Sequence, residues 1–232
     1  MDPASERTSK WSPATSALSP LKCAHSQCLN REFSTLAPLD TQVSGFMPFP
    51  YHQRAAIVRE KQAALHAAFA DVRHRYDRSP ANQRWRRSIE ELRAALEAAF
   101  PPDFDAALNG LRRADCGGID VLIEFLEADP MFFRSGYVKT QILRALKRVP
   151  LTLPQVSRLH AVILGVVGTR WNREFGDYVR LALKLDDPNL RAGLRELVSA
   201  PGADTRRRAK RMLATLPATP GGPPRDWRRQ GG

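Results

Sequence analysis

The chain lacks the two features that most directly mark membrane proteins and disulfide-stabilised proteins: long apolar runs and paired cysteines. Its longest apolar run, from Ala161 to Val167, is interrupted by Gly165 and falls far short of the ~18 residues that span a bilayer. Its three cysteines are too scattered for a disulfide framework. The first residues contain no apolar segment of the kind that secretory signals carry. We therefore expect no membrane span and a reducing, cytoplasmic location.

A third absence concerns β-structure. No segment of useful length alternates apolar and polar residues, which is the pattern of a half-buried strand. Apolar residues recur instead at steps of three to four, which is the pattern of amphipathic helices. The predicted fold class is therefore all-α.

Both ends of the chain are poor in large apolar residues. Residues 1–50 contain six prolines and many Ser, Thr and Ala residues, without a sustained period. From Pro217 onward, Pro, Gly and Arg dominate. We expect a disordered leader over residues 1–50 and a disordered tail over residues 217–232. Met47, just before the first expected helix, is a second candidate start codon.

Residues 51–116 predict an N-terminal helical bundle that caps the segments after it. The first helix is expected from Tyr51 to Tyr76, and Ser79-Pro80 supplies an N-cap and a first-turn proline for the second. Pro101-Pro102 ends that second helix, and Asp103 is expected to cap a shorter third one. The apolar stripe expected on the first helix consists of Ile57, Leu65, Phe69, Val72 and Tyr76.

Residues 117–216 read as three consecutive helix–turn–helix units, each about 33 residues long. The units start near Gly117, Leu153 and Asp187, and each breaks in its middle at a Pro, Gly or polar turn. The clearest helix start is the capping box Thr152-Leu-Pro-Gln155. Because a pair of short amphipathic helices cannot bury its apolar face alone, it must stack on neighbouring pairs. The sequence therefore predicts stacked helical hairpins.

The third unit carries a motif as well as a length. Asp187-Pro-Asn-Leu-Arg opens its first helix, and Asp204, expected as a cap, opens an Arg-rich second helix that contains Ala209. This pattern resembles a HEAT-type repeat, in which Asp-Pro opens the first helix and a second Asp precedes an Arg-rich one. The units at 117–149 and 153–186 agree in length and helix pairing but not in motif. The resemblance implies a short HEAT-like α-solenoid that binds macromolecules, and it implies no particular chemistry.

The net charge of +12 is concentrated toward the C-terminal end. Residues 1–50 carry four basic and four acidic side chains, whereas residues 187–216 carry seven and three. The main basic cluster consists of Arg206, Arg207, Arg208, Lys210 and Arg211. Helical geometry points Arg207 and Arg211 away from the core and places the other three at its flanks. Phosphate binding would offset their mutual repulsion; the alternative is a solvated helix whose cations suit the helix dipole.

Two further groups of residues are candidates for the same surface. Arg144, Lys147 and Arg148 lie on the outward side of their expected helix, and solenoid curvature would have to bring them into line with the basic cluster. Trp171 and Arg173 stand together at a turn, where aromatic and basic groups suit base stacking or a protein-binding hot spot. The alternative for Trp171 is that it fills the gap between two helices.

Metal, cofactor and catalytic signatures are weak. Cys23, His25 and Cys28 offer three soft ligands, but a structural zinc site needs four and Cys116 is remote. The histidines lack the pairings of metallohydrolases. Gly165-Val-Val-Gly168 lacks the preceding strand and the third glycine of a dinucleotide-binding loop. We expect no metal, no cofactor and no catalytic residue.

These observations lead to three hypotheses of function. The preferred one is a non-enzymatic scaffold or adaptor that binds a protein partner through its repeat surface. The second is a nucleic-acid-binding module that uses the basic cluster, with binding that weakens steeply as salt rises. The third is a DNA glycosylase, because the chain is similar to the HEAT-like alkylpurine DNA glycosylases in size, charge and helical content; no residue carries over from that likeness.

Overall fold

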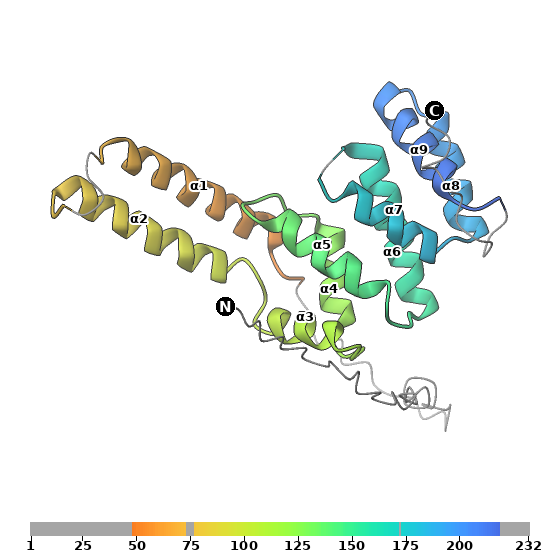
Figure 1. Cartoon of the computed structure of the whole chain (residues 1–232), viewed down its shortest axis with the longest axis horizontal. Helices are drawn as coiled ribbons and strands as arrows, with labels where there is room; N and C mark the ends of the chain where they lie inside the picture. Colours follow the sequence, from red (N-terminus) through yellow and green to blue (C-terminus); the bar gives the residue numbers. More distant parts are fainter. Residues whose placement is uncertain (1–47, 73–76, 172, 219–232) are drawn as a thin grey trace, which may run out of the picture. The chain divides into compact units, whose positions relative to one another are not determined.

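A computed structural model describes residues 48–72, 77–171 and 173–218, in which nine α-helices and no strand are present. The predicted all-α class is therefore confirmed for this part of the chain. The helices are α1 (Tyr51–Ala70), α2 (Pro80–Glu97), α3 (Phe104–Arg112), α4 (Ile119–Ala128), α5 (Ser135–Leu146), α6 (Leu153–Thr169), α7 (Phe175–Lys184), α8 (Pro188–Val198) and α9 (Ala203–Thr215) (Figure 1). No helix in these ranges is long and apolar enough to cross a membrane. Most of the predicted leader and tail lies outside the described residues.

Three helices begin where the sequence predicts, because a side chain satisfies the free amides of the first turn. Ser79 caps α2 in front of a first-turn proline. Thr152 and Gln155 form the reciprocal capping box at the start of α6. Asp187 caps α8, its carboxylate accepting from the backbone amide of Leu190 at 2.8 Å.

Two predicted caps are wrong. Asp103 precedes α3 but already has right-handed helical dihedrals, and its side chain makes no capping hydrogen bond. A capping side chain needs an extended backbone to reach the first amides of its helix, so this conformation prevents the cap. The N-cap of α9 is Gly202, and Asp204 lies inside the first turn, where it pairs with Arg207.

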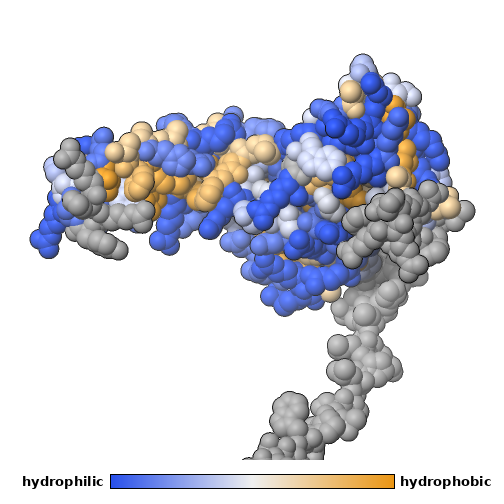
Figure 2. Space-filling model, turned by 45° about the horizontal axis from the view of Figure 1, so that its top comes forward, coloured by the Kyte–Doolittle hydropathy of each residue, from blue (hydrophilic) through white to orange (hydrophobic). Residues whose placement is uncertain are grey.

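Helices α1 and α2 run antiparallel as a hairpin (Figure 1), and their main contacts are with each other. The expected extension of α1 to Tyr76 is not observed, because the helix ends at Ala70. The expected apolar stripe is only partly present: Leu65 packs against the hairpin cluster, whereas Ile57 and Phe69 are 40% and 42% exposed, and Tyr76 lies outside the described residues. The buried residues of α1 are Tyr51, Ala55 and Val58. Alanines all around α1 blur its periodicity, and apolar side chains remain visible along the hairpin surface (Figure 2).

The main apolar core is formed by helices α3 to α9. Aromatic rings join its first part: the ring of Phe125 on α4 lies 5.1 Å from that of Phe104 and 5.4 Å from that of Tyr51. Four apolar residues of α3 are buried in this core; they are Phe104, Ala107, Leu108 and Leu111. Tyr51 also attaches the start of α1 to this core.

Consecutive helix pairs contact each other in a regular order from residue 117 onward. The first helices of the pairs, α4, α6 and α8, contact one another in turn, and the second helices, α5, α7 and α9, do the same. Helix α3 contacts both α4 and α5. Two glycines permit close approach: a Cβ at Gly118, where φ is +79°, would lie 2.7 Å from Ala107, and one at Gly193 would lie 2.5 Å from Leu164. Substitution at Gly118 would strain the backbone and press against Ala107, whereas substitution at Gly193 would force the Leu164 side chain to move aside.

Candidate functional site

The cations of α9 fall into two groups, and the first serves the fold. Arg208 is only 6% exposed, and its guanidinium donates to the carbonyls of Val167 (2.7 Å) and Gly168 (3.2 Å) at the end of α6. Arg206 donates to two carbonyls of the α8–α9 turn. Arg208 therefore satisfies carbonyls that a helix end leaves without partners, and Arg206 satisfies carbonyls of a turn. Arg208, expected at the flank of the core, is buried by this carbonyl pair and is not part of the exposed basic surface.

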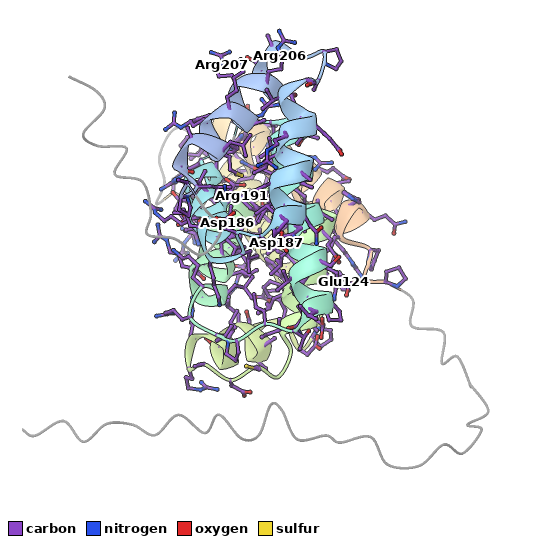
Figure 3. All side chains as sticks on the ribbon, turned by 90° about the vertical axis from the view of Figure 1, so that its right-hand side faces the viewer. Glu124, Asp186, Asp187, Arg191, Arg206 and Arg207 are labelled. Carbon is purple, nitrogen blue, oxygen red and sulfur yellow. The ribbon has the colours of Figure 1, made fainter. Side chains whose placement is uncertain are left out.

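The second group of α9 cations is exposed and consists of Arg207, Lys210 and Arg211. Arg207 pairs with Asp204 within the helix, and Figure 3 shows Arg206 and Arg207 together at one end of α9. Lys210 has no hydrogen bond or ion pair among the described residues. The Arg211 guanidinium lies over the Trp171 ring, 4.7 Å from its centroid, which is cation–π geometry.

Trp171 lies at the turn between α6 and α7 and is 51% exposed. Its ring is stacked on Phe175, with centroids 4.6 Å apart and an interplanar angle of 18°. The alternative in which Trp171 fills an interhelical gap is therefore wrong. Phe175, which is 2% exposed, occupies that inner position instead and leaves the tryptophan above it.

A second pair of an arginine and an aromatic ring is present in the preceding helical pair, and it was not predicted from the sequence. Arg173 lies over the ring of Tyr137, 4.2 Å from its centroid, and Tyr137 is 55% exposed. Phe133 beside it is 45% exposed and carries Arg134 over its ring. The sequence signal that could have indicated this pair is an aromatic-rich turn, Met131-Phe-Phe-Arg. It lies between two helices whose inward positions are already occupied by other apolar residues. We call the following residues the aromatic–arginine surface: Phe133, Arg134, Tyr137, Trp171, Arg173 and Arg211.

A buried charge cluster joins the α4–α5 turn, which precedes Tyr137, to the α6–α7 turn, which carries Trp171. Lys139 is fully buried, and its Nζ lies 2.5 Å from Asp129 Oδ1. Arg170 forms an ion pair with the other oxygen of Asp129. Burial lowers the pKa of Lys139, although the nearby Asp129 carboxylate acts in the opposite direction. Because Asp129 pairs with both cations, it fixes the α4–α5 turn against the α6–α7 turn.

The predicted extension of the basic surface along α5 is only partly present. Arg144 is exposed, but its Nε lies 3.2 Å from Asp177 on α7, which also pairs with Arg180. Arg148 is exposed, whereas Lys147 is half-buried and burial lowers its pKa. Since Asp177 offsets the charge of Arg144, this group adds less to the positive field than its sequence suggests.

A pocket lies between α9 and the α6–α7 turn, with a volume of about 610 Å³. We call it the α9 pocket; its lining residues are Thr169, Arg170, Trp171, Asp204, Arg207, Arg208 and Arg211. Its one carboxylate, Asp204, is 71% exposed and ion-paired, so it is not the desolvated group that acid–base chemistry requires. The pocket is therefore suited to binding an anion.

Metal sites and likeness to known proteins give no further assignment. No cluster of His, Cys, Asp and Glu that could hold a metal occurs within residues 48–72, 77–171 and 173–218. Cys23, His25 and Cys28, considered above as zinc ligands, lie outside the described residues. Comparisons with protein-family models, curated proteins and solved structures gave no match.

Proposed function

We propose that this chain is a HEAT-like helical-repeat adaptor that binds a protein partner through the aromatic–arginine surface. The stacked arrangement is supported by the order of helix contacts, in which first helices meet first helices and second helices meet second helices. Ionic contacts between units reinforce it, since Arg158 on α6 reaches Asp120 at 2.7 Å and Glu127 at 2.7 Å on α4. The α1–α2 hairpin and α3 then form the N-terminal cap of the solenoid.

The single observation that carries the binding proposal is the repeated pairing of an exposed aromatic ring with an arginine from farther along the chain. Arg173 covers Tyr137, and Arg211 covers Trp171. Tyr, Trp and Arg are the residues that dominate binding energy in protein interfaces, because they bury large areas at low conformational cost. An arginine held on a ring also keeps its in-plane N–H groups available for acidic groups of a partner.

The test is cross-linking of the tagged protein in the cells that produce it, followed by quantification of the bound proteins. The double variant Tyr137→Ala/Trp171→Ala should lose the specific partner by at least about tenfold, which corresponds to the loss of a typical hot spot. Leu153→Ala is the matched control, because Leu153 is 85% exposed and lies at the start of α6, outside this surface. Equal recovery of the same proteins by all three forms would refute the proposal.

A nucleic-acid interface is the second candidate function, and the α9 pocket is the observation that favours it. Arg207 and Arg211 line this pocket together with the aromatic ring of Trp171. On this hypothesis, reversal of both arginines to glutamate abolishes retention of an oligonucleotide at low salt. Absence of retention for the unmodified protein would dispose of this candidate.

A further inference from the structure

The arginines of the α9 pocket differ in how firmly they are held. Arg208 is fixed by the carbonyls at the end of α6, and Arg170 is fixed by Asp129. Within the described residues, Arg207 is bound only to Asp204, and both of these side chains are more than 70% exposed. An exposed pair of this kind contributes little and exchanges easily. The pocket therefore combines two preset cations with a third that an incoming anion can recruit.

Arg211 supplies a fourth guanidinium next to an aromatic wall. It follows Arg207 by one helical turn on α9, so the two side chains lie on the same side of the helix. Its contact with the Trp171 ring orients the guanidinium and leaves its N–H groups free. Four guanidinium groups and one carboxylate line this hollow, and Asp129 offsets the charge of Arg170. The net positive charge that remains favours a dianion over a monoanion.

We propose that the α9 pocket binds the phosphoryl group of a phosphorylated side chain in the protein partner. A phosphoryl group offers three acceptor oxygens and close to two negative charges, so it can accept from several arginines at once, whereas a carboxylate satisfies one guanidinium fork. The wall formed by Trp171 and Thr169 accommodates the carbon atoms that carry the phosphate. This inference rests on the proposed adaptor function and specifies the chemistry of its partner.

The described residues favour a single phosphorylated side chain over a nucleic-acid strand. A strand needs a track of available cations, but Arg206 is bound to carbonyls and Arg144 to Asp177. It also needs free aromatic faces for its bases, whereas the Trp171 ring is already contacted by Phe175 and Arg211. Of the arginines on α9, Arg207, Arg208 and Arg211 instead converge on one hollow.

The test uses the full-length protein and follows the indole N–H signal of Trp171 by NMR, assigned with Trp171→Phe. The probes are phenyl phosphate, benzoate as the carboxylate of similar size, and a single-stranded DNA 12-mer. Phenyl phosphate should shift the signal saturably and bind at least about tenfold more tightly than benzoate. Equal affinities for phenyl phosphate and benzoate would overturn the proposal, as would tighter binding of the 12-mer with a steep salt dependence.

Variants then assign the site. Arg207→Gln and Arg211→Gln should each weaken phenyl phosphate binding by about tenfold or more. Lys210→Gln removes one charge from the same exposed helix without altering the pocket lining, so it should bind as the unmodified protein does. Arg207 does not contact Trp171 in the described structure, so its variant separates loss of phosphate binding from a disturbed reporter. Equal losses in all three variants would indicate a diffuse field and overturn the assignment.

The last arm links the pocket to the partner. Phosphatase treatment before capture should lower recovery of the cross-linked partner by about tenfold or more. If recovery is unchanged by phosphatase but still depends on Tyr137 and Trp171, this inference fails while the adaptor function stands. If phenyl phosphate binds but the Tyr137→Ala/Trp171→Ala variant retains every partner, the adaptor function through that surface fails.

Discussion

The α1–α2 hairpin and the α3–α9 region are both helical, but they are stabilised in different ways. The hairpin has a small buried cluster, Val58, Leu92 and Ala99, and apart from Tyr51, which packs in the main core, its other large apolar residues are half-buried or exposed. Every helix of the α3–α9 region contributes residues to one continuous core. Two paired helices expose the sides that a third layer would cover, whereas stacked pairs cover each other. A helix pair with the same apolar pattern is therefore less stable at the end of the stacked helix pairs than inside the stack.

The largest expected difference concerns ion pairs. In the α3–α9 region, Arg191 and Asp186 form a bidentate pair with 2.6 Å contacts, and the Asp186 side chain is 3% exposed. Figure 3 shows both residues on neighbouring segments at α8. Asp186→Asn leaves a buried guanidinium without its counter-charge and should cost about 3–5 kcal/mol. In the hairpin, Glu91→Gln breaks the exposed pair with Lys61 and should cost below about 1 kcal/mol. Urea unfolding of both variants measures the difference, and similar losses would contradict it.

The next prediction concerns how far the destabilisation caused by a cavity spreads through the structure. Leu92→Ala in α2 should cost about 2 kcal/mol, and faster amide exchange should be confined to α1 and α2. Leu194→Ala in α8 removes a fully buried side chain and should accelerate exchange throughout α3–α9. Hydrogen–deuterium exchange with peptide resolution distinguishes the two patterns. Accelerated exchange in α4–α9 of the Leu92→Ala variant would show that the hairpin and the larger core unfold together.

A smaller effect separates two neighbouring arginines of α9. Arg208→Ala removes the buried hydrogen bonds to Val167 and Gly168, so it should cost about 1.5–3 kcal/mol. Arg207→Ala breaks only the exposed contact with Asp204 and should change stability by less than about 0.5 kcal/mol. Thermal melting of the two variants, with Lys210→Ala as an exposed control, provides the measurement. A large loss for Arg207→Ala would show that the exposed pair contributes to the fold.

The smallest predicted effect depends on alkali. Burial raises the pKa of Tyr51 and of Tyr178, both of which pack in the main core, and neither hydroxyl has a hydrogen-bond partner among the described residues. Above pH 10 these tyrosines ionise in the unfolded chain but not in the folded one, so stability falls as pH rises. Tyr178→Phe should therefore lose about 1 kcal/mol less than the unmodified protein between pH 10 and pH 11.

Three lysines act in the opposite direction in that alkaline range. Burial lowers the pKa of Lys139, Lys147 and Lys184, which raises stability between their folded pKa values and 10.5. This contribution is the same in the unmodified protein and in Tyr178→Phe, so it cancels in the comparison. Identical alkaline slopes for the two proteins would show that Tyr178 is ionised equally in both states.

Local signals in the sequence were sufficient to predict that these segments are helical, but they were not sufficient to predict which polar side chains are buried. Proline and capping residues fixed the starts of α2, α6 and α8, because a cap is read from neighbouring residues alone. The burial of Arg208 was not predictable, because its carbonyl partners lie some 40 residues earlier in the chain. Tyr137 was missed for the same reason, since Arg173 reaches it from the following unit. The buried face of α1 was predicted only in part, because alanine fits either an inner or an outer face.

Basic side chains that bind helix ends set different constraints along one helix. Arg208 binds carbonyls at the end of α6, and Lys184 binds a carbonyl at the end of α5. These side chains satisfy groups that a C-terminal glycine motif satisfies in many other helices. Across natural variants of this chain, position 208 should retain a guanidinium, while position 210 drifts freely. The residue at position 207 should vary with the anion that the partner presents, so substitutions there should accompany changes of partner.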